Sequence, residues 1–214
     1  MRKSRKIRYD ISPTYAFVVD GETEIWYLQM LKRNERSIRV NIKPEIPNRK
    51  TIKEQFDLVV DLSGREYLRV FWIVDLDTVV KESREISKEK KPPISMLIDY
   101  RNQLKKKYKN VTLIINNPCL EYWFLLHFKA TSKLYKECLK VEGQLRKVLS
   151  GYEKTRQYYT GQGNDIYLKL KPHLNSAIRN AQTLGEFSED EPLKALCEMD
   201  LLFTSDELKD IALN

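Results

Sequence analysis

Short apolar runs separated by amphipathic segments dominate the first half of the chain. Residues 15–20, 67–74 and 111–115 are runs of mostly apolar residues, and each is short enough to form a strand. Continuous apolar runs of this length are typical of strands that are buried on both faces. Residues 40–46 alternate apolar and polar side chains around Pro44, which favours a strand at the edge of a sheet.

The segments between these runs have the spacing of helices. Thr51 with Glu54 three residues later forms a capping box, which predicts the start of a helix at this point. The apolar positions expected on the buried faces of three helices are Ile25, Leu28 and Leu31, then Ile52, Phe56, Val59 and Val60, then Ile94, Leu97, Ile98 and Leu104. Alternating strands and helices predict an α/β fold with a mostly parallel Rossmannoid sheet flanked by helices.

Beyond residue 115 we expect helices and no further strands. Residues 119–128 are apolar nearly all round, which predicts a buried helix. Further helices are expected over 133–149, 167–181 and 193–213, with an ordered loop at 151–165. The polar residues 81–91 should form a loop or a frayed helix. We therefore expect an α/β core over residues 13–130 and a helical extension over 131–214.

Acidic side chains follow two of the expected strands. Asp20, Glu22 and Glu24 come after the first strand, and Asp75 and Asp77 end a later one. The carboxyl ends of neighbouring parallel strands meet at one edge of a sheet, where ligands bind. Carboxylates gathered there repel each other unless a cation joins them. Oxygen ligands predict Mg²⁺ or Mn²⁺, and in an extended strand Asp75 and Asp77 would lie about 7 Å apart on one face.

Each of these acidic residues also has a purely structural interpretation. Asp75 and Asp77 can cap a turn, and acidic residues in the first turn of a helix complement its dipole. Glu121 lies on the apolar helix, so it must be paired, protonated or bound to a metal, and a buried ion pair with Arg or Lys is the structural alternative. His127 on the same helix is interpreted as a core histidine.

The composition limits the partners, metals and cellular location that we expect. A formal charge of +8 permits a polyanionic partner without requiring one. The three cysteines, Cys119, Cys138 and Cys197, are widely spaced and suggest reduced, buried thiols in helices of a cytoplasmic protein. A zinc site is not expected, because there is no paired Cys or clustered His spacing. No apolar run has the length of a membrane span, so no membrane partner is expected.

Three segments carry a resemblance to a known family. They are YAFVVDGETE, FWIVDLDT and NNPCLEYWFLLHF, and together they resemble the RloB-like family, which is linked to AbiLii-type abortive-infection proteins and has a core similar to Toprim domains. The resemblance implies a Mg²⁺-dependent nuclease in a bacterial phage-defence or restriction-linked system. It also implies that Asp20 takes the place of the acid–base glutamate of Toprim domains and that Asp75 and Asp77 hold the metal.

The turn after the first strand departs from the family pattern, because it is one residue shorter and begins with Asp instead of Glu. Glu22 or Glu24 can therefore replace Asp20 as metal ligand or general base. With Glu121 as support, the expected function is hydrolysis of phosphodiester bonds in DNA or RNA. The alternative is a non-catalytic Toprim-like subunit that binds nucleic acid or a partner ATPase, which the shortened turn favours.

Overall fold

A five-stranded sheet forms the centre of the part of the chain that the structure describes. The computed structural model describes residues 14–19, 21–36, 39–43, 50–85, 91–206 and 208–213. The strands lie in the order β2-β1-β3-β4-β5. Their bounds are β1 Thr14–Val18, β2 Arg39–Lys43, β3 Arg69–Asp75, β4 Val111–Asn117 and β5 Leu196–Cys197. The first four strands are mutually parallel, which confirms the α/β class and the mostly parallel sheet.

The fifth strand corrects the expectation that strands end at residue 115. Strand β5 pairs antiparallel with β4, with Cys197 opposite Asn116. A strand of two residues carries no periodic pattern, so only its tertiary contact with β4 defines it.

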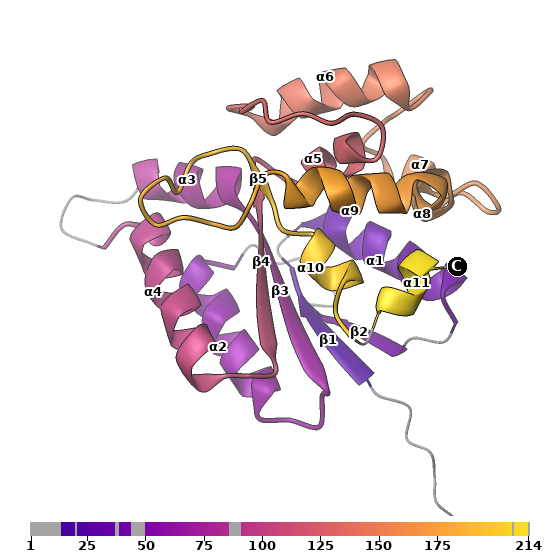
Figure 1. Cartoon of the computed structure of the whole chain (residues 1–214). Coiled ribbons are helices and arrows are strands. Elements are labelled where there is room, and N and C mark those ends of the chain that lie inside the picture. The colour runs from indigo at the N-terminus through magenta and orange to yellow at the C-terminus, as the bar shows by residue number, and fades with distance from the viewer. Residues whose placement is uncertain are drawn as a thin grey trace, which may run out of the picture.

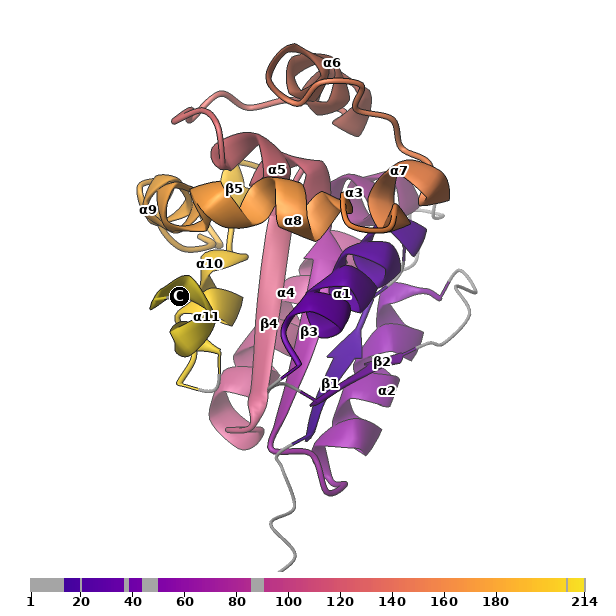
Figure 2. The ribbon, with the colours of Figure 1, turned by 90° about the vertical axis from the view of Figure 1, so that its right-hand side faces the viewer.

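Helices cover both faces of the sheet and its carboxyl edge (Figures 1 and 2). Their bounds are α1 Glu22–Asn34, α2 Ile52–Ser63, α3 Leu76–Glu85, α4 Pro93–Lys107, α5 Leu120–Leu126, α6 Cys138–Val148, α7 Arg156–Thr160, α8 Ile166–Leu170, the 3₁₀ helix η1 Lys171–His173, α9 Leu174–Gln182, α10 Asp200–Phe203 and α11 Lys209–Leu213. The predicted capping box is present, since Thr51 N donates to Glu54 Oε2 at 2.8 Å and Glu54 N donates to Thr51 Oγ1 at 3.3 Å.

Successive residues of β1 and of β3 enter two separate cores. Phe17 and Phe71 belong to the core under α1, α5 and the later helices, whereas Val18 and Trp72 belong to the core under α2, α3 and α4. All four side chains have no exposed surface. Burial on both faces explains why these strands are apolar throughout.

The later part of the chain differs from the sequence expectation in its boundaries. The helix expected over 133–149 begins at Cys138, and the helix expected over 167–181 is divided by η1, which contains Pro172. The expected loop at 151–165 contains α7, because Thr155 caps it by accepting a hydrogen bond from Tyr158 N at 3.3 Å. Of the residues 81–91 expected to form a loop or a frayed helix, 81–85 continue α3, and 86–90 lie outside the described residues.

The strand order defines where a ligand can enter. From β1 the chain passes through α1 to β2 on one side, and then through α2 to β3 on the other side of β1. The two connections diverge between β1 and β3, which is the topological switch point where open α/β sheets bind ligands. Among the described residues, no helix is both long and apolar enough to span a membrane.

Candidate metal site in an acidic cleft

A cleft of about 480 Å³ lies at the carboxyl ends of β1 and β3, at the switch point of the sheet. Its acidic lining residues are Glu22, Glu24, Asp75, Asp77 and Glu82, its basic ones are Lys50, Lys81 and Lys154, and the others are Gly21, Thr23, Trp26, Thr78, Cys119 and Cys138. The structure thus brings together the acidic residues expected from both strand ends. Asp20, the remaining member of the predicted cluster, lies outside the described residues.

The turn after β1 presents one buried and one exposed glutamate. Glu24 is only 2% exposed and accepts a hydrogen bond from Thr23 Oγ1 at 3.2 Å, whereas Glu22 is exposed at the start of α1. The carboxylate of Glu24 folds back over Gly21, where an added Cβ would lie 2.1 Å from Glu24 Oε2. Gly21 is therefore required for this position of the Glu24 side chain.

Asp75 and Asp77 reach the cleft from different elements. Asp75 is the last residue of β3, but Asp77 lies in the first turn of α3, so the prediction of two aspartates on one extended strand is wrong. The helix begins directly after the strand. Leu76, between the two aspartates, is fully buried, and Asp77 N donates to Pro118 O at 3.1 Å.

The Asp77 carboxylate has two local partners. Its Oδ1 accepts from Thr78 Oγ1 at 3.4 Å, and its Oδ2 lies 3.5 Å from Lys81 Nζ. The side chain of Lys81 is 66% exposed, so this ion pair contributes little to stability. A cation that approaches Asp77 can therefore displace Lys81 at small cost.

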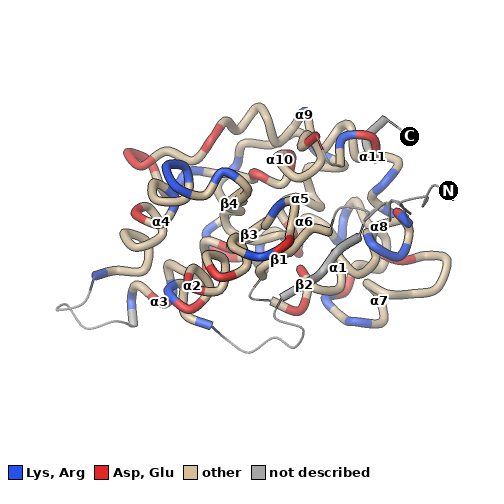
Figure 3. The backbone as a smooth tube through the Cα atoms, turned by 90° about the horizontal axis from the view of Figure 1, so that it is seen from below, with Lys and Arg blue, Asp and Glu red and all other residues tan. Residues whose placement is uncertain are grey.

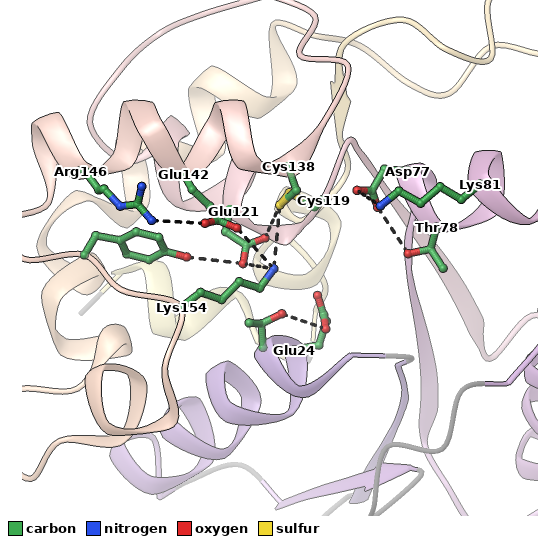
Figure 4. Close-up of a disulfide and its surroundings, with 12 residues drawn as sticks. Glu24, Asp77, Thr78, Lys81, Cys119, Glu121, Cys138, Glu142, Arg146 and Lys154 are labelled. Carbon is green, nitrogen blue, oxygen red and sulfur yellow. Dashed lines mark hydrogen bonds and ion pairs between the residues drawn. A yellow bond between two sulfur atoms is a disulfide. The ribbon is translucent and has the colours of Figure 1, made fainter.

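Glu121 lies behind the cleft wall and does not line the cleft. Its side chain has no exposed surface, as its apolar helix predicted. Lys154 Nζ donates to Glu121 Oε1 at 2.8 Å (Figure 4). The hydroxyls of Tyr159 and Tyr152 lie 3.4 and 3.5 Å from the same oxygen and 2.8 Å from each other, so one hydroxyl donates to the other and the second donates to Glu121. The structural alternative of a buried ion pair therefore describes this residue.

Lys154 joins the buried Glu121 to the cleft. Burial acts to lower the pKa of Lys154, but the negative charge of Glu121, with smaller contributions from Glu24 and Asp75, outweighs it and raises that pKa. The ammonium therefore stays charged at the cleft wall. The sequence did not identify this residue, because one lysine among 38 Lys and Arg has no local pattern that sets it apart.

A disulfide between Cys119 and Cys138 forms part of the same wall (Figure 4). This corrects the expectation of reduced thiols for these two residues, and the buried free thiol Cys197 lies in β5, not in a helix. Packing of α6 against α5 brings together two cysteines that are 19 residues apart. Cys138 Sγ lies 3.0 Å from Glu121 Oε2, but both sulfur atoms are committed to the disulfide and are not thiolate ligands for a soft metal.

His127 is a core histidine, as predicted. It is 2% exposed, and its Nδ1 lies 2.9 Å from Trp123 O, which fits an Nδ1–H donor. Burial lowers its pKa to about 3, so the imidazole is neutral near pH 7.

The net positive charge does not by itself identify a binding face. Figure 3 shows Lys and Arg distributed over several helices, with Asp and Glu interspersed. The three lysines at the cleft are informative because they stand next to the acidic cluster.

Comparison with known families gives a match over most of the chain. The family model described as RloB-like protein matches residues 15–205, which is most of the chain. Comparisons with curated proteins and with solved structures give no match.

Proposed function

Because the chain belongs to the RloB-like protein family, we propose that it is a divalent-metal-dependent nuclease that hydrolyses phosphodiester bonds of DNA or RNA. The observation that carries the proposal is the cleft between β1 and β3, where carboxylates from two neighbouring parallel strand ends face a rim of lysines. A Toprim-like core and a role in bacterial phage defence are further parts of this proposal, and they rest on the sequence resemblance. A cytoplasmic location is also proposed, and it rests on the lack of an apolar run with the length of a membrane span.

The donor set of the cleft fits a hard cation. Glu24, Asp75 and Asp77 offer only carboxylate oxygens, the ligands preferred by Mg²⁺ and Mn²⁺. We propose that Asp75 and Asp77 hold the ion together with Glu24, or with Asp20 from the same turn. Such an ion, when bound, polarises a phosphoryl oxygen and lowers the pKa of a bound water.

The residues of the chain itself supply the remaining functions. Lys50, Lys81 and Lys154 stand at the cleft and would bind the phosphate oxygens of a nucleic-acid backbone. Lys154 is held for this by Glu121, so Glu121 acts as a positioning residue. Glu22 is the exposed carboxylate at the cleft and would accept a proton from the attacking water.

A second function is favoured by the ion pairs already present. Lys81 pairs with Asp77, and the charge of Lys154 acts on Glu24 and Asp75, so lysines partly balance the acidic cluster without a metal. A non-catalytic subunit that binds nucleic acid or a partner ATPase would need no more than this. The shortened turn after β1 points in the same direction.

A cleavage assay separates the two functions. The purified chain is incubated with labelled single-stranded and duplex DNA and RNA in Mg²⁺, Mn²⁺ or EDTA. We expect metal-dependent cleavage that is lost in the double variant Asp75→Asn, Asp77→Asn. The matched control is Asp57→Asn, Asp61→Asn, because both aspartates are more than half exposed on α2 and lie outside the cleft. Binding of nucleic acid without cleavage under all conditions would support the non-catalytic function.

A further inference from the structure

Trp26 differs from the other tryptophans of the chain. Trp72 and Trp123 have no exposed surface and belong to the two cores. Trp26 is only partly buried and lines the acidic cleft. A tryptophan at a cleft wall offers a large flat apolar surface to whatever enters the cleft.

The position of Trp26 on α1 places its ring beside the acidic turn. Trp26 is one helical turn after Glu22, so the two side chains share a face of the helix, and both line the cleft. A ligand whose phosphate lies at the carboxylates therefore has an aromatic ring within the next turn of the same helix.

The ring has a rigid support on its core side. Tyr159 contacts it edge to face, with the ring centroids 5.5 Å apart and an interplanar angle of 64°. Tyr159 is fully buried, and its hydroxyl lies 2.8 Å from that of Tyr152 and 3.4 Å from Glu121 Oε1. The same buried network therefore holds the ammonium of Lys154 and, through Tyr159, supports the ring of Trp26.

The dimensions and chemistry of the cleft fit one nucleotide. Its volume of about 480 Å³ is that of a pocket for a small organic molecule. Single-stranded nucleic acid is bound by aromatic rings on which bases stack, next to lysines that bind the phosphate backbone. In a duplex the bases already stack on each other, and each must be unstacked at a cost before it can reach a side chain.

We propose that Trp26 is a base-stacking platform and that the cleft takes an unpaired nucleotide, so that the substrates are single strands, loops or frayed ends. The proposal rests on the nuclease function proposed above, because the phosphate of that nucleotide would lie at the carboxylates and lysines. Interaction with an unpaired base also explains a partly exposed indole beside charged groups.

Intrinsic fluorescence tests this directly, because Trp72 and Trp123 are inaccessible to added oligonucleotide. The full chain is titrated in Ca²⁺ with a mixed-sequence 12-nucleotide single strand and with the corresponding blunt duplex, and binding is measured in parallel by anisotropy of a labelled strand. We expect the single strand to quench the emission and to bind more tightly than the duplex. Trp26→Ala should weaken single-strand binding by about 5- to 100-fold, and Trp26→Phe by much less.

The control is Leu139→Ala, which removes an apolar side chain that is 69% exposed on α6 and does not line the cleft. Melting temperatures of all variants show whether a loss of binding reflects unfolding, and recovery in Trp26→Phe identifies the ring as the cause. Equal quenching by both ligands, or unchanged single-strand affinity in Trp26→Ala, would overturn the proposal.

Cleavage of the same oligonucleotides in Mn²⁺ distinguishes the two proposals. Ring-dependent binding of the single strand without any metal-dependent cleavage would remove the nuclease function and leave the nucleotide site. Metal-dependent cleavage of the duplex as fast as the single strand would keep the nuclease function and refute the unpaired-nucleotide site.

Discussion

Replacing Gly21 with alanine should displace the Glu24 side chain from the candidate metal site although no acidic residue is replaced. The added Cβ would lie 2.1 Å from Glu24 Oε2, whereas ordinary contacts begin at 3.4 Å. The carboxylate must therefore move by about 1.3 Å. Metal–ligand distances tolerate only about 0.2 Å, so a displaced Glu24 can no longer serve as a direct ligand in its present position.

The expected loss of metal affinity is about 10- to 100-fold, the range found when groups that position metal ligands are changed. The effect on folding is smaller, because the obstructing atom is the end of a flexible side chain. Alanine in place of glycine at the helix N-cap should destabilise α1 by about 0.5–1 kcal/mol. The variant therefore separates loss of metal binding from loss of fold.

Mn²⁺ affinity is measured by calorimetric titration, and stability by urea unfolding without metal. Gly21→Ser is the informative companion, because serine carries the same Cβ but is a good N-cap residue. It should lose Mn²⁺ affinity as alanine does and keep its stability. Gly143→Ala is the control for an added Cβ, since no atom beyond its chain neighbours and the backbone of its own helix lies within 4 Å of that Cβ. Unchanged Mn²⁺ affinity in both Gly21 variants would refute a role for Glu24 in metal binding.

Three further predictions concern groups around the cleft and the core. Lys154→Met should destabilise the fold by about 1–3 kcal/mol, which is less than the loss of a fully buried ion pair because the lysine side chain is 39% exposed. It should also strengthen Mn²⁺ binding because a nearby positive charge is lost, and unchanged urea unfolding would contradict the predicted loss of stability. His127 should lower the free energy of unfolding by about 2 kcal/mol between pH 7 and pH 5, because the unfolded imidazole gains a proton below about pH 6.5 and the folded one, with its pKa lowered to about 3, does not. In urea unfolding, the stability of His127→Gln should therefore depend less steeply on pH, and the same dependence as in the parent would contradict this. Replacing Cys119 and Cys138 with serine should cost about 3 kcal/mol, and the denatured unreduced parent should show one reactive thiol, whereas three would exclude the disulfide.

The sheet could be predicted because buried parallel strands leave a strong local signal. The apolar runs at 15–20, 67–74 and 111–115 overlap β1, β3 and β4, since these strands are buried on both faces. Strand β5 could not be predicted, because it exists only through its pairing with β4. Pro172 is visible in the sequence, but the apolar spacing over 167–181 predicts one helix across it, whereas η1 divides that segment.

The candidate site was predictable where it depends on strand ends and not where it depends on distant contacts. The acidic residues after β1 and β3 meet because parallel strands end at one edge. Burial of Glu121 followed from its apolar helix, but its partner Lys154 comes from a loop 33 residues later in the chain. The disulfide likewise depends on how α6 packs against α5, and two cysteines so far apart give no spacing signal.

Binding of Mn²⁺ to the protein without nucleic acid tests the metal site most directly. Calorimetric titration, with electron paramagnetic resonance of free Mn²⁺ as a second measurement, is applied to the parent and to the double variant Asp75→Asn, Asp77→Asn. We predict saturable binding to the parent, a rise in melting temperature of the kind expected for a ligand that binds only the folded state, and loss of both in the variant. Absence of binding to the parent, or equal binding to the variant, would contradict a metal site at these aspartates.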